Sequence, residues 1–344
     1  MSHLIAIVGP TAVGKSALAI HLAQVFGGEI VSADSRQVFR GMDIGTAKPG
    51  PEERAQVPHH LIDVVEPDQD FTLAHYQQMA IRAIADIQRR GRLALLMGGS
   101  GLYVRALVGG FSIPHVRPDA ELRRSLEEKA AAEGYMALYE ELKGVDPTAA
   151  KRIDPRNVRR VIRALEVFHA TGLPFSQLQG SSPFLPSLHT LTIGLTTARV
   201  NLYQRIDSRV DSMMKQGLIQ EVEGLLKRGY SLDLPAMSGL GYKQIGQYLQ
   251  GELSLAEAVQ RIKYETHRFA RHQYAWFRPN DEEIHWFDVR DRMEEPIRNL
   301  IQGFIFEQTG MELAKPGIYN RATGKVNCHE ARIESMEQPG RTKK

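Results

Sequence analysis

The sequence of 344 residues contains very little cysteine, since Cys328 is its only one. A single thiol excludes an internal disulfide and a zinc site built from cysteines, and it fits a reducing compartment. No apolar run approaches the ~20 residues that a membrane-spanning helix requires. An apolar segment begins within a few residues of Met1, which leaves no room for a signal peptide. We therefore expect a cytoplasmic protein without a membrane partner.

Charge of one sign is not in large excess either. Lys and Arg total 43 while Asp and Glu total 40, so the formal net charge is only +3. So small a value does not identify a nucleic-acid partner, and the placement of the charges is more informative than their sum. Hydrophobic residues make up 42% of the chain, as in ordinary soluble proteins. At this length we expect one large domain and one smaller domain.

The stretch that organises the chain is a phosphate-loop pattern near its start. An apolar run over residues 4–8 leads into Gly9-Pro-Thr-Ala-Val-Gly14-Lys15-Ser16, and a helical pattern follows. The pattern is complete and stands in the strand–loop–helix setting that confirms it. Glycines permit close approach of a ligand, amides at a helix N-terminus attract anions, and Lys15 adds a full positive charge. We therefore predict phosphate binding by Gly9, Pro10, Thr11, Ala12, Val13, Gly14, Lys15 and Ser16, with the Ser16 hydroxyl as a ligand of Mg²⁺.

The second predicted strand, residues 28–33, ends at Asp34-Ser35-Arg36-Gln37. Ligands of open α/β sheets bind beyond the carboxyl ends of the strands, so Asp34 should stand beside the phosphate loop. Asp34 is therefore the best candidate for a catalytic residue. Asp and Ser are also common caps of helices and turns, and this structural role is the alternative.

A polar loop rich in glycine and proline follows, with His59, His60 and Asp63 as possible metal ligands. Adjacent histidines generally point to different sides, and no third histidine follows at a zinc spacing, so a metal site is not favoured. The spacing of apolar residues predicts a helix over 71–90 and a buried strand over 93–97. This strand ends in Gly98-Gly99-Ser100 instead of an acidic residue, which disfavours a plain nucleotide hydrolase.

Residues 113–189 have a different pattern, with helices rich in Arg, Lys and Glu. We interpret them as an inserted helical domain. Arg156, Arg159, Arg160 and Arg163 recur at offsets of three and four, which predicts a basic stripe on one helix face that is able to bind phosphates. A charged face that is merely solvated is the alternative.

The sheet pattern resumes at residues 190–195 and is followed by helical sequence over 201–228 and a flexible turn over 235–243 that ends in Lys243. From Arg261 to Arg278, basic and aromatic residues alternate. This mixture suits RNA, because cations neutralise phosphates while rings stack on bases, although the aromatic residues alone would also fit a core. These patterns predict a core of 1–112 with 190–308, an insert of 113–189 and a poorly ordered polar tail of 309–344.

Several motifs together resemble the bacterial tRNA dimethylallyltransferases, also called tRNA isopentenyltransferases. They are the phosphate loop, residues 31–37 leading to 41–49, the Gly98-to-Tyr103 turn, Arg163-Ala-Leu-Glu166 and the segment from Arg271 to Arg278. The resemblance extends from the first strand to about Asp288. It implies a P-loop NTPase-like α/β fold, in which helices flank a parallel sheet and an all-helical domain is inserted. Ser100 and Phe39 stand where Thr and Tyr are frequent in the family.

The resemblance implies transfer of a dimethylallyl group from dimethylallyl diphosphate to N6 of the adenosine on the 3′ side of the anticodon. The phosphate loop would then hold the leaving diphosphate instead of ATP, with Mg²⁺ bound at Ser16. Asp34 would act as the general base, and Arg209 would help Lys15 to hold the diphosphate. A P-loop kinase and a non-catalytic RNA-binding switch are the competing interpretations.

The resemblance also implies which residues contact the tRNA, with the insert closing over the anticodon stem. Neither a second copy nor another protein partner is implied, so we expect a monomer. The implied tRNA contacts are Asp34, Ser35, Arg36, Gln37, Ser100, Arg123, Arg159, Arg160, Val161, Ile162, Arg163, Ser238, Gly239, Leu240, Gly241, Tyr242 and Lys243.

Overall fold

A parallel six-stranded sheet forms the centre of the computed structural model, which describes residues 3–109, 116–178 and 188–309 and the pairs 319–320 and 325–326. The strand order is β3-β2-β4-β1-β5-β6, and each neighbouring pair in it is parallel. The strands are β1 (His3–Val8), β2 (Glu29–Ala33), β3 (His59–His60), β4 (Ala94–Gly98), β5 (His189–Thr196) and β6 (Ile284–Asp288). The parallel α/β sheet expected from the sequence is therefore confirmed.

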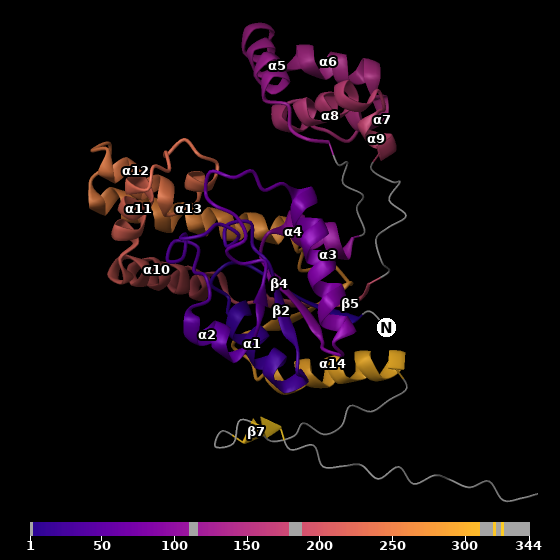
Figure 1. The fold of residues 1–344 in the computed structure, drawn as a ribbon, viewed down its shortest axis with the longest axis vertical. Coiled ribbons are helices and arrows are strands. Elements are labelled where there is room, and N and C mark those ends of the chain that lie inside the picture. Colours follow the sequence, from indigo (N-terminus) through magenta and orange to yellow (C-terminus); the bar gives the residue numbers. More distant parts are fainter. Residues whose placement is uncertain (1–2, 110–115, 179–187, 310–318, 321–324, 327–344) are drawn as a thin grey trace, which may run out of the picture.

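Helices cover both faces of the sheet, as Figure 1 shows. Along β1, Ile5 and Ile7 pack with α1 (Lys15–Phe26) and α14 (Glu294–Thr309), whereas Leu4 and Ala6 pack with α3 (Leu73–Arg89) and α4 (Gly101–Val108). Successive side chains of a strand point to opposite faces, so a strand covered on both sides is apolar throughout. This explains why β1 reads as an uninterrupted apolar run.

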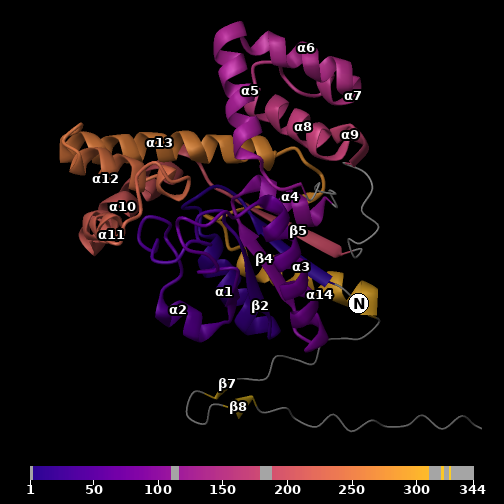
Figure 2. The same ribbon diagram turned by 45° about the horizontal axis from the view of Figure 1, so that its top comes forward.

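A second group of helices lies beyond the carboxyl ends of the strands (Figure 2). It consists of α10 (Arg199–Gln216), α11 (Leu218–Lys227), the 3-10 turn η1 (Ala236–Ser238), α12 (Tyr242–Leu249) and the long α13 (Leu255–Trp276). Their shared apolar core includes Val210, Leu218 and Ile262. The helical sequence predicted over 201–228 forms two helices, because Gly217 adopts φ 101° and separates α10 from α11. The turn predicted over 235–243 is likewise corrected to η1 followed by the start of α12.

Residues 116–178 form a helical unit, the insert, with an apolar core of its own that includes Leu138 and Leu165. Its helices are α5 (Ala120–Glu133), α6 (Tyr135–Val145), α7 (Pro147–Ala150), α8 (Val158–Thr171) and α9 (Phe175–Leu178). In both ribbon views it stands apart from the sheet (Figures 1 and 2). The predicted four-arginine stripe is wrong in one member, since α8 begins at Val158 after its cap Asn157, while Arg156 bonds Asp154 ahead of the helix.

The remaining predictions concern elements outside these units. The expected boundary at 112–113 lies outside the described residues, as does most of the predicted tail. Within 310–344 the described pairs Tyr319–Asn320 and Lys325–Val326 form a short antiparallel ladder.

One further helix of the core, α2 (Pro51–Gln56), precedes β3. Across the described ranges, no helix combines the length and the apolar character needed to cross a bilayer.

Candidate active site

The phosphate loop joins β1 to α1, as the sequence predicts. Gly9 has φ 140° and Gly14 has φ 114°, backbone angles that L side chains rarely adopt. A Cβ at Gly9 would lie 2.5 Å from the carbonyl oxygen of Leu195, so β5 and the loop approach more closely than a side chain allows. Both glycines are therefore required by the backbone path itself.

Lys15 begins α1 and turns its side chain back over the loop. Its Nζ donates to the carbonyl oxygens of Gly9, at 3.0 Å, and Pro10, at 2.7 Å. Burial and, to a lesser extent, the positive charge of Arg209 lower the pKa of Lys15, the negative charge of Asp34 opposes them, and the net result is a pKa of about 7. A positive charge held in this way is stabilised by an anionic ligand.

Two arginines of α10 reach the same loop. Arg209 Nη1 lies 3.5 Å from the Thr11 hydroxyl, and Arg205 Nη1 donates to the Val13 carbonyl oxygen at 3.1 Å. The two residues are four apart, so they lie on one face of the helix. Sequence reasoning selected Arg209 but missed Arg205, although that spacing was the available signal.

Asp34 follows β2 and faces a cavity of about 280 Å³. Its Oδ1 accepts the Arg36 backbone N–H at 2.8 Å, so it also caps a turn. The Ser100 hydroxyl accepts the Ser35 backbone N–H at 3.0 Å, which joins the end of β2 to the turn after β4. The structural and the catalytic interpretation of Asp34 are therefore compatible, because one oxygen is enough to cap the turn.

The cavity beside Asp34 has a polar side and an apolar side. The apolar side consists of Ile206, Val210 and Met213 of α10 and Ile262 and Phe269 of α13. Sequence reasoning did not find this wall, although the spacing of 206, 210 and 213 marks one helix face. The predicted residues that line the same cavity are Thr11, Asp34, Ser35, Arg36, Ser100, Arg209, Ser238, Gly239, Leu240, Gly241 and Tyr242.

A second cavity, of about 550 Å³, is also lined by Arg209. Its lining includes Ala12 of the phosphate loop and Gln204, Arg205 and Ser208 of α10. Arg209 therefore contributes to both cavities.

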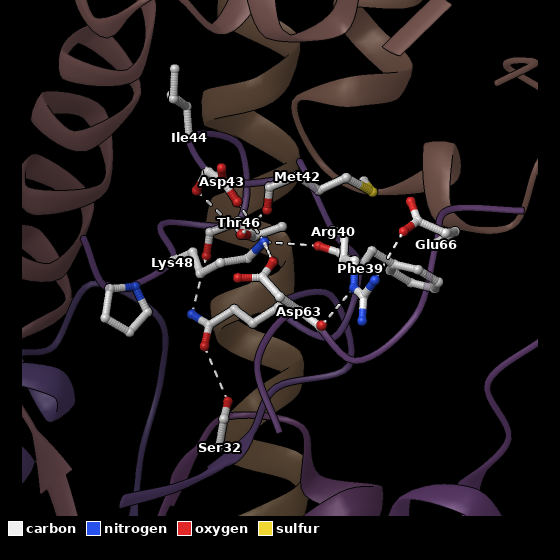
Figure 3. Close-up of polar contacts among 12 residues, drawn as sticks. Ser32, Phe39, Arg40, Met42, Asp43, Ile44, Thr46, Lys48, Asp63 and Glu66 are labelled. Carbon is white, nitrogen blue, oxygen red and sulfur yellow. Dashed lines mark hydrogen bonds and ion pairs between the residues drawn. The ribbon is translucent and has the colours of Figure 1, made fainter. Parts of the chain in front are cut away.

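One wall of the first cavity is the segment Gly45–Ala47, and next to it lies an ionic cluster around the buried Lys48 (Figure 3). Lys48 Nζ donates to the Phe39 carbonyl oxygen at 2.8 Å and contacts the carboxylates of Asp43 and Asp63 at 2.5 and 2.6 Å. The Lys48 side chain is only 1% exposed. Figure 3 shows its ammonium group directed at these three oxygens.

Two further side chains hold the same wall. Gln37 Nε2 donates to the carbonyl oxygens of Thr46 and Ala47, while its Oε1 accepts the Ser32 hydroxyl. From α11, the Glu221 carboxylate accepts the backbone N–H groups of residues 43, 44 and 45. Gln37 is buried, and its side chain supports the cavity wall, while its contact with tRNA stays a prediction.

The polar side of the cavity is joined to β2 by Arg36. Its guanidinium donates to the carbonyl oxygens of Pro235 and Ala236 and to the Ser238 hydroxyl, at 2.7 to 3.2 Å. Lys243 lies in the first turn of α12, where it is exposed, and it does not line this cavity.

The predicted residues of the insert divide into two kinds. Arg123 and Arg163 both pair with Glu166, which is fully buried, whereas Arg159 and Arg160 are exposed. The side chains of Val161 and Ile162 are buried in the core of the insert. Any contact that these last two residues make with a ligand would therefore be through the backbone. None of the insert residues lines the first cavity.

A metal site built by side chains alone is not found among the described residues, where no group of three or more His, Cys, Asp and Glu is suitably arranged. His60 Nε2 contacts the buried Glu29, and His59 Nδ1 contacts the Val57 carbonyl oxygen. The Ser16 hydroxyl lies in the first turn of α1, 4.0 Å from the Met97 sulfur. Mg²⁺ commonly takes one or two protein ligands together with phosphate oxygens and water, so this hydroxyl fits such a role.

Comparison with known proteins places these features in a family. A model of the IPP transferase family matches residues 37–280. The tRNA dimethylallyltransferase of Roseiflexus castenholzii is 59% identical over 278 residues, which is 81% of this chain and 90% of the relative. The crystal structure of a tRNA isopentenylpyrophosphate transferase from Bacillus halodurans matches with a TM-score of 0.67 and 42% identity, over 90% of this chain and 99% of that one. A eukaryotic dimethylallyltransferase acting on tRNA matches with a TM-score of 0.74 and 26% identity, over 92% and 82%.

Proposed function

The chain belongs to the IPP transferase family and is a prenyltransferase that modifies tRNA, and from this premise we propose the reaction of its site. A dimethylallyl group passes from dimethylallyl diphosphate to N6 of the adenosine on the 3′ side of the anticodon. The observation that carries the proposal is that Thr11, Asp34 and Arg209 line one cavity together with an apolar wall. That single space brings an anion site, a base and a place for a hydrocarbon next to one another.

The leaving diphosphate is assigned to the phosphate loop. As the bond between carbon and oxygen breaks, negative charge grows on the departing oxygen, and positive groups already in place lower the barrier. The N-terminus of α1, Lys15 and Arg209 supply that charge. Arg205 of the same helix face adds to it from the second cavity.

Asp34 is assigned as the general base. When N6 of the adenine forms its bond to the allylic carbon, the nitrogen must lose a proton, and a carboxylate within hydrogen-bond reach can accept it. One Asp34 oxygen is held by the Arg36 N–H, which leaves the other for the amine. The products are the prenylated adenosine and diphosphate.

The apolar wall formed by α10 and α13 is assigned to the dimethylallyl group. An allylic carbon that carries positive charge reacts readily with water, so the space around it has to exclude solvent. Ile206, Val210 and Phe269 provide such a surface next to Asp34. The adenine reaches this space only when it is turned out of its stack, because a stacked base does not fit a closed pocket.

Mg²⁺ is the proposed cofactor, with the Ser16 hydroxyl as its protein ligand. When bound, the ion neutralises part of the charge on the diphosphate. All the groups assigned to the chemistry belong to one chain, so we propose that the monomer is the active unit.

The test uses dimethylallyl diphosphate labelled in its prenyl group and tRNA that lacks the modification. We expect label to enter one adenosine of the tRNA, detected by nucleoside mass spectrometry, without ATP consumption. Asp34→Asn keeps an oxygen for the Arg36 N–H but removes the base, so kcat should fall by about 10²- to 10⁴-fold with an unchanged Kd for tRNA. The exposed Asp233→Asn serves as the matched control and should retain full turnover. Phosphoryl transfer from ATP without prenyl transfer would instead support a kinase.

A further inference from the structure

Gln273 of α13 joins two segments that are far from it in the sequence. Its Oε1 accepts the backbone N–H of Thr11 at 2.8 Å, and its Nε2 donates to the carbonyl oxygen of Gly99 at 3.0 Å. Thr11 belongs to the phosphate loop after β1, and Gly99 to the turn after β4, the parallel neighbour of β1. One carboxamide therefore connects the ends of two adjacent strands. The side chain is buried, with 3% of the residue exposed.

The turn after β4 is shaped to receive this carboxamide. A Cβ placed on Gly99 would lie 2.2 Å from Gln273 Nε2, so the close approach depends on a glycine at this position. The residue at position 273 must donate a hydrogen bond to the Gly99 carbonyl oxygen and accept one from the Thr11 N–H. Glutamine supplies both without charge, whereas an ionised glutamate has no donor and methionine has no N–H.

The same helix also forms part of the apolar wall. Ile262, Thr266 and Phe269 of α13 line the first cavity, and Gln273 follows Phe269 by one helical turn. Thr11 in turn points its hydroxyl toward Arg209, 3.5 Å away. Gln273 therefore joins the phosphate loop directly to the helix that carries part of the apolar wall, beside the contacts that Arg205 and Arg209 of α10 make with the same loop.

We propose that Gln273 is a positioning residue, which holds the phosphate loop in the conformation that binds diphosphate and at the correct distance from the prenyl wall. The inference rests on the proposed function of the loop. Nothing in it requires Gln273 to touch a substrate. Reaction geometry is sensitive to small displacements, so a loop held loosely should affect both diphosphate affinity and turnover.

The test compares Gln273→Met and Gln273→Glu with the matched control Gln77→Met. Gln77 is buried to a similar extent, and its Nε2 donates to the Ala106 carbonyl oxygen between α3 and α4. Inorganic diphosphate binding is measured by calorimetry, donor KM and kcat by labelled transfer, and Tm by thermal unfolding. We expect both methionine variants to lower Tm, but only Gln273→Met should raise the Kd for diphosphate and lower kcat/KM for the donor, each by about tenfold.

The pH profile of Gln273→Glu separates positioning from simple packing. At about pH 8 the carboxylate repels the Gly99 carbonyl oxygen, so diphosphate binding should be weaker than in Gln273→Met. At about pH 6 a buried carboxyl regains a proton and its donor, and binding should recover toward that of the wild type. Each Kd is divided by that of the wild type at the same pH, which removes the titration of Lys15 and of diphosphate itself, and this ratio should show no such recovery for Gln273→Met.

The outcomes distinguish this inference from the proposed function. Wild-type affinity for diphosphate in both Gln273 variants, together with a lower Tm, would overturn the positioning role while leaving the transferase reaction intact. A wild-type protein that neither binds diphosphate nor labels tRNA would overturn the proposed function itself.

Discussion

Two lysines of the site, Lys15 and Lys48, are surrounded by different partners. The ammonium group of Lys48 contacts two carboxylates and is almost completely buried, whereas that of Lys15 contacts the carbonyl oxygens of Gly9 and Pro10. Within the described part of the chain, Lys15 forms no ion pair. A cation that is already neutralised holds structure, and one that is not neutralised keeps its charge for a ligand. The comparison predicts that one lysine matters for turnover and the other for stability.

The largest expected effect is on turnover, in Lys15→Met. Loss of the positive group that we propose to act on the leaving oxygen should lower kcat by about 10²- to 10³-fold. The free energy of unfolding should stay the same or rise, because the fold no longer has to desolvate an unpaired cation. Steady-state kinetics and thermal unfolding measure the two effects. The exposed Lys227→Met is the control, and a Tm drop in Lys15→Met without a kcat loss would contradict the comparison.

The next largest effect is on stability, in Lys48→Met. The change leaves the Phe39 carbonyl oxygen without its donor and takes one partner from Asp63, which keeps Arg54. We expect unfolding to become easier by about 2–3 kcal/mol, since Asp43 is partly exposed and recovers water. Urea denaturation measures this change in the free energy of unfolding. Lys129→Met, which removes the more exposed pair with Glu141, should destabilise the protein much less than Lys48→Met. An equal loss of stability in Lys48→Met and Lys129→Met would contradict the structural role of Lys48.

The pH dependence of diphosphate binding gives a further test of the difference between the two lysines. The pKa of Lys15 is lowered to about 7, so raising the pH above this value removes the positive charge that we propose to bind diphosphate. We expect the Kd of the wild type for diphosphate to rise by up to about tenfold per pH unit above 7. The Kd of Lys15→Met is measured at the same pH values, because this variant shows only the titration of diphosphate itself. Calorimetry in buffers of different ionisation enthalpy should detect proton uptake on binding.

The lowered pKa of Lys15 also affects folding stability. Between about pH 7 and 10.5 the unfolded chain binds more protons at this group than the folded chain does. The contribution of Lys15 to the free energy of unfolding therefore increases as the pH rises through that window.

The smallest effects extend the comparison to the arginines of the insert. Arg159 and Arg160 are exposed, and no ion pair of either is found across the described ranges, whereas Arg123 pairs with the buried Glu166. Arg159→Ala with Arg160→Ala should reduce the salt dependence of tRNA binding by about 0.7–0.9 in slope for each phosphate that the two arginines neutralise, with little change in Tm. Arg123→Ala should mainly lower Tm. An unchanged salt slope in the double variant would make the pair a solvated surface.

Local features of the site were predictable from the sequence. The strand, the loop and the first turn of α1 are contiguous, so a pattern of eight residues, from Gly9 to Ser16, determines both their fold and their chemistry. Asp34 could be placed as well, because the topology of parallel sheets brings the carboxyl ends of strands together.

Other features depend on contacts across the chain, and no local pattern encodes them. Gln273 bonds Thr11 across 262 positions, and Lys48 finds Asp63 only when the loop before β3 folds back. Arg156 shares a three-and-four spacing with its neighbours, yet Asn157 begins the helix after it. The support that Gln37 gives to the cavity wall was also not predicted, because its bonds to Thr46 and Ala47 depend on how the following loop folds back.

Arg209 lines two cavities, which bears on the order in which the products leave in steady state. If diphosphate departs through the second cavity, the modified nucleoside need not leave the first one beforehand. We therefore expect the rate law to contain no compulsory order of product release. In product-inhibition experiments, diphosphate should lower the maximal velocity with respect to tRNA instead of competing with it.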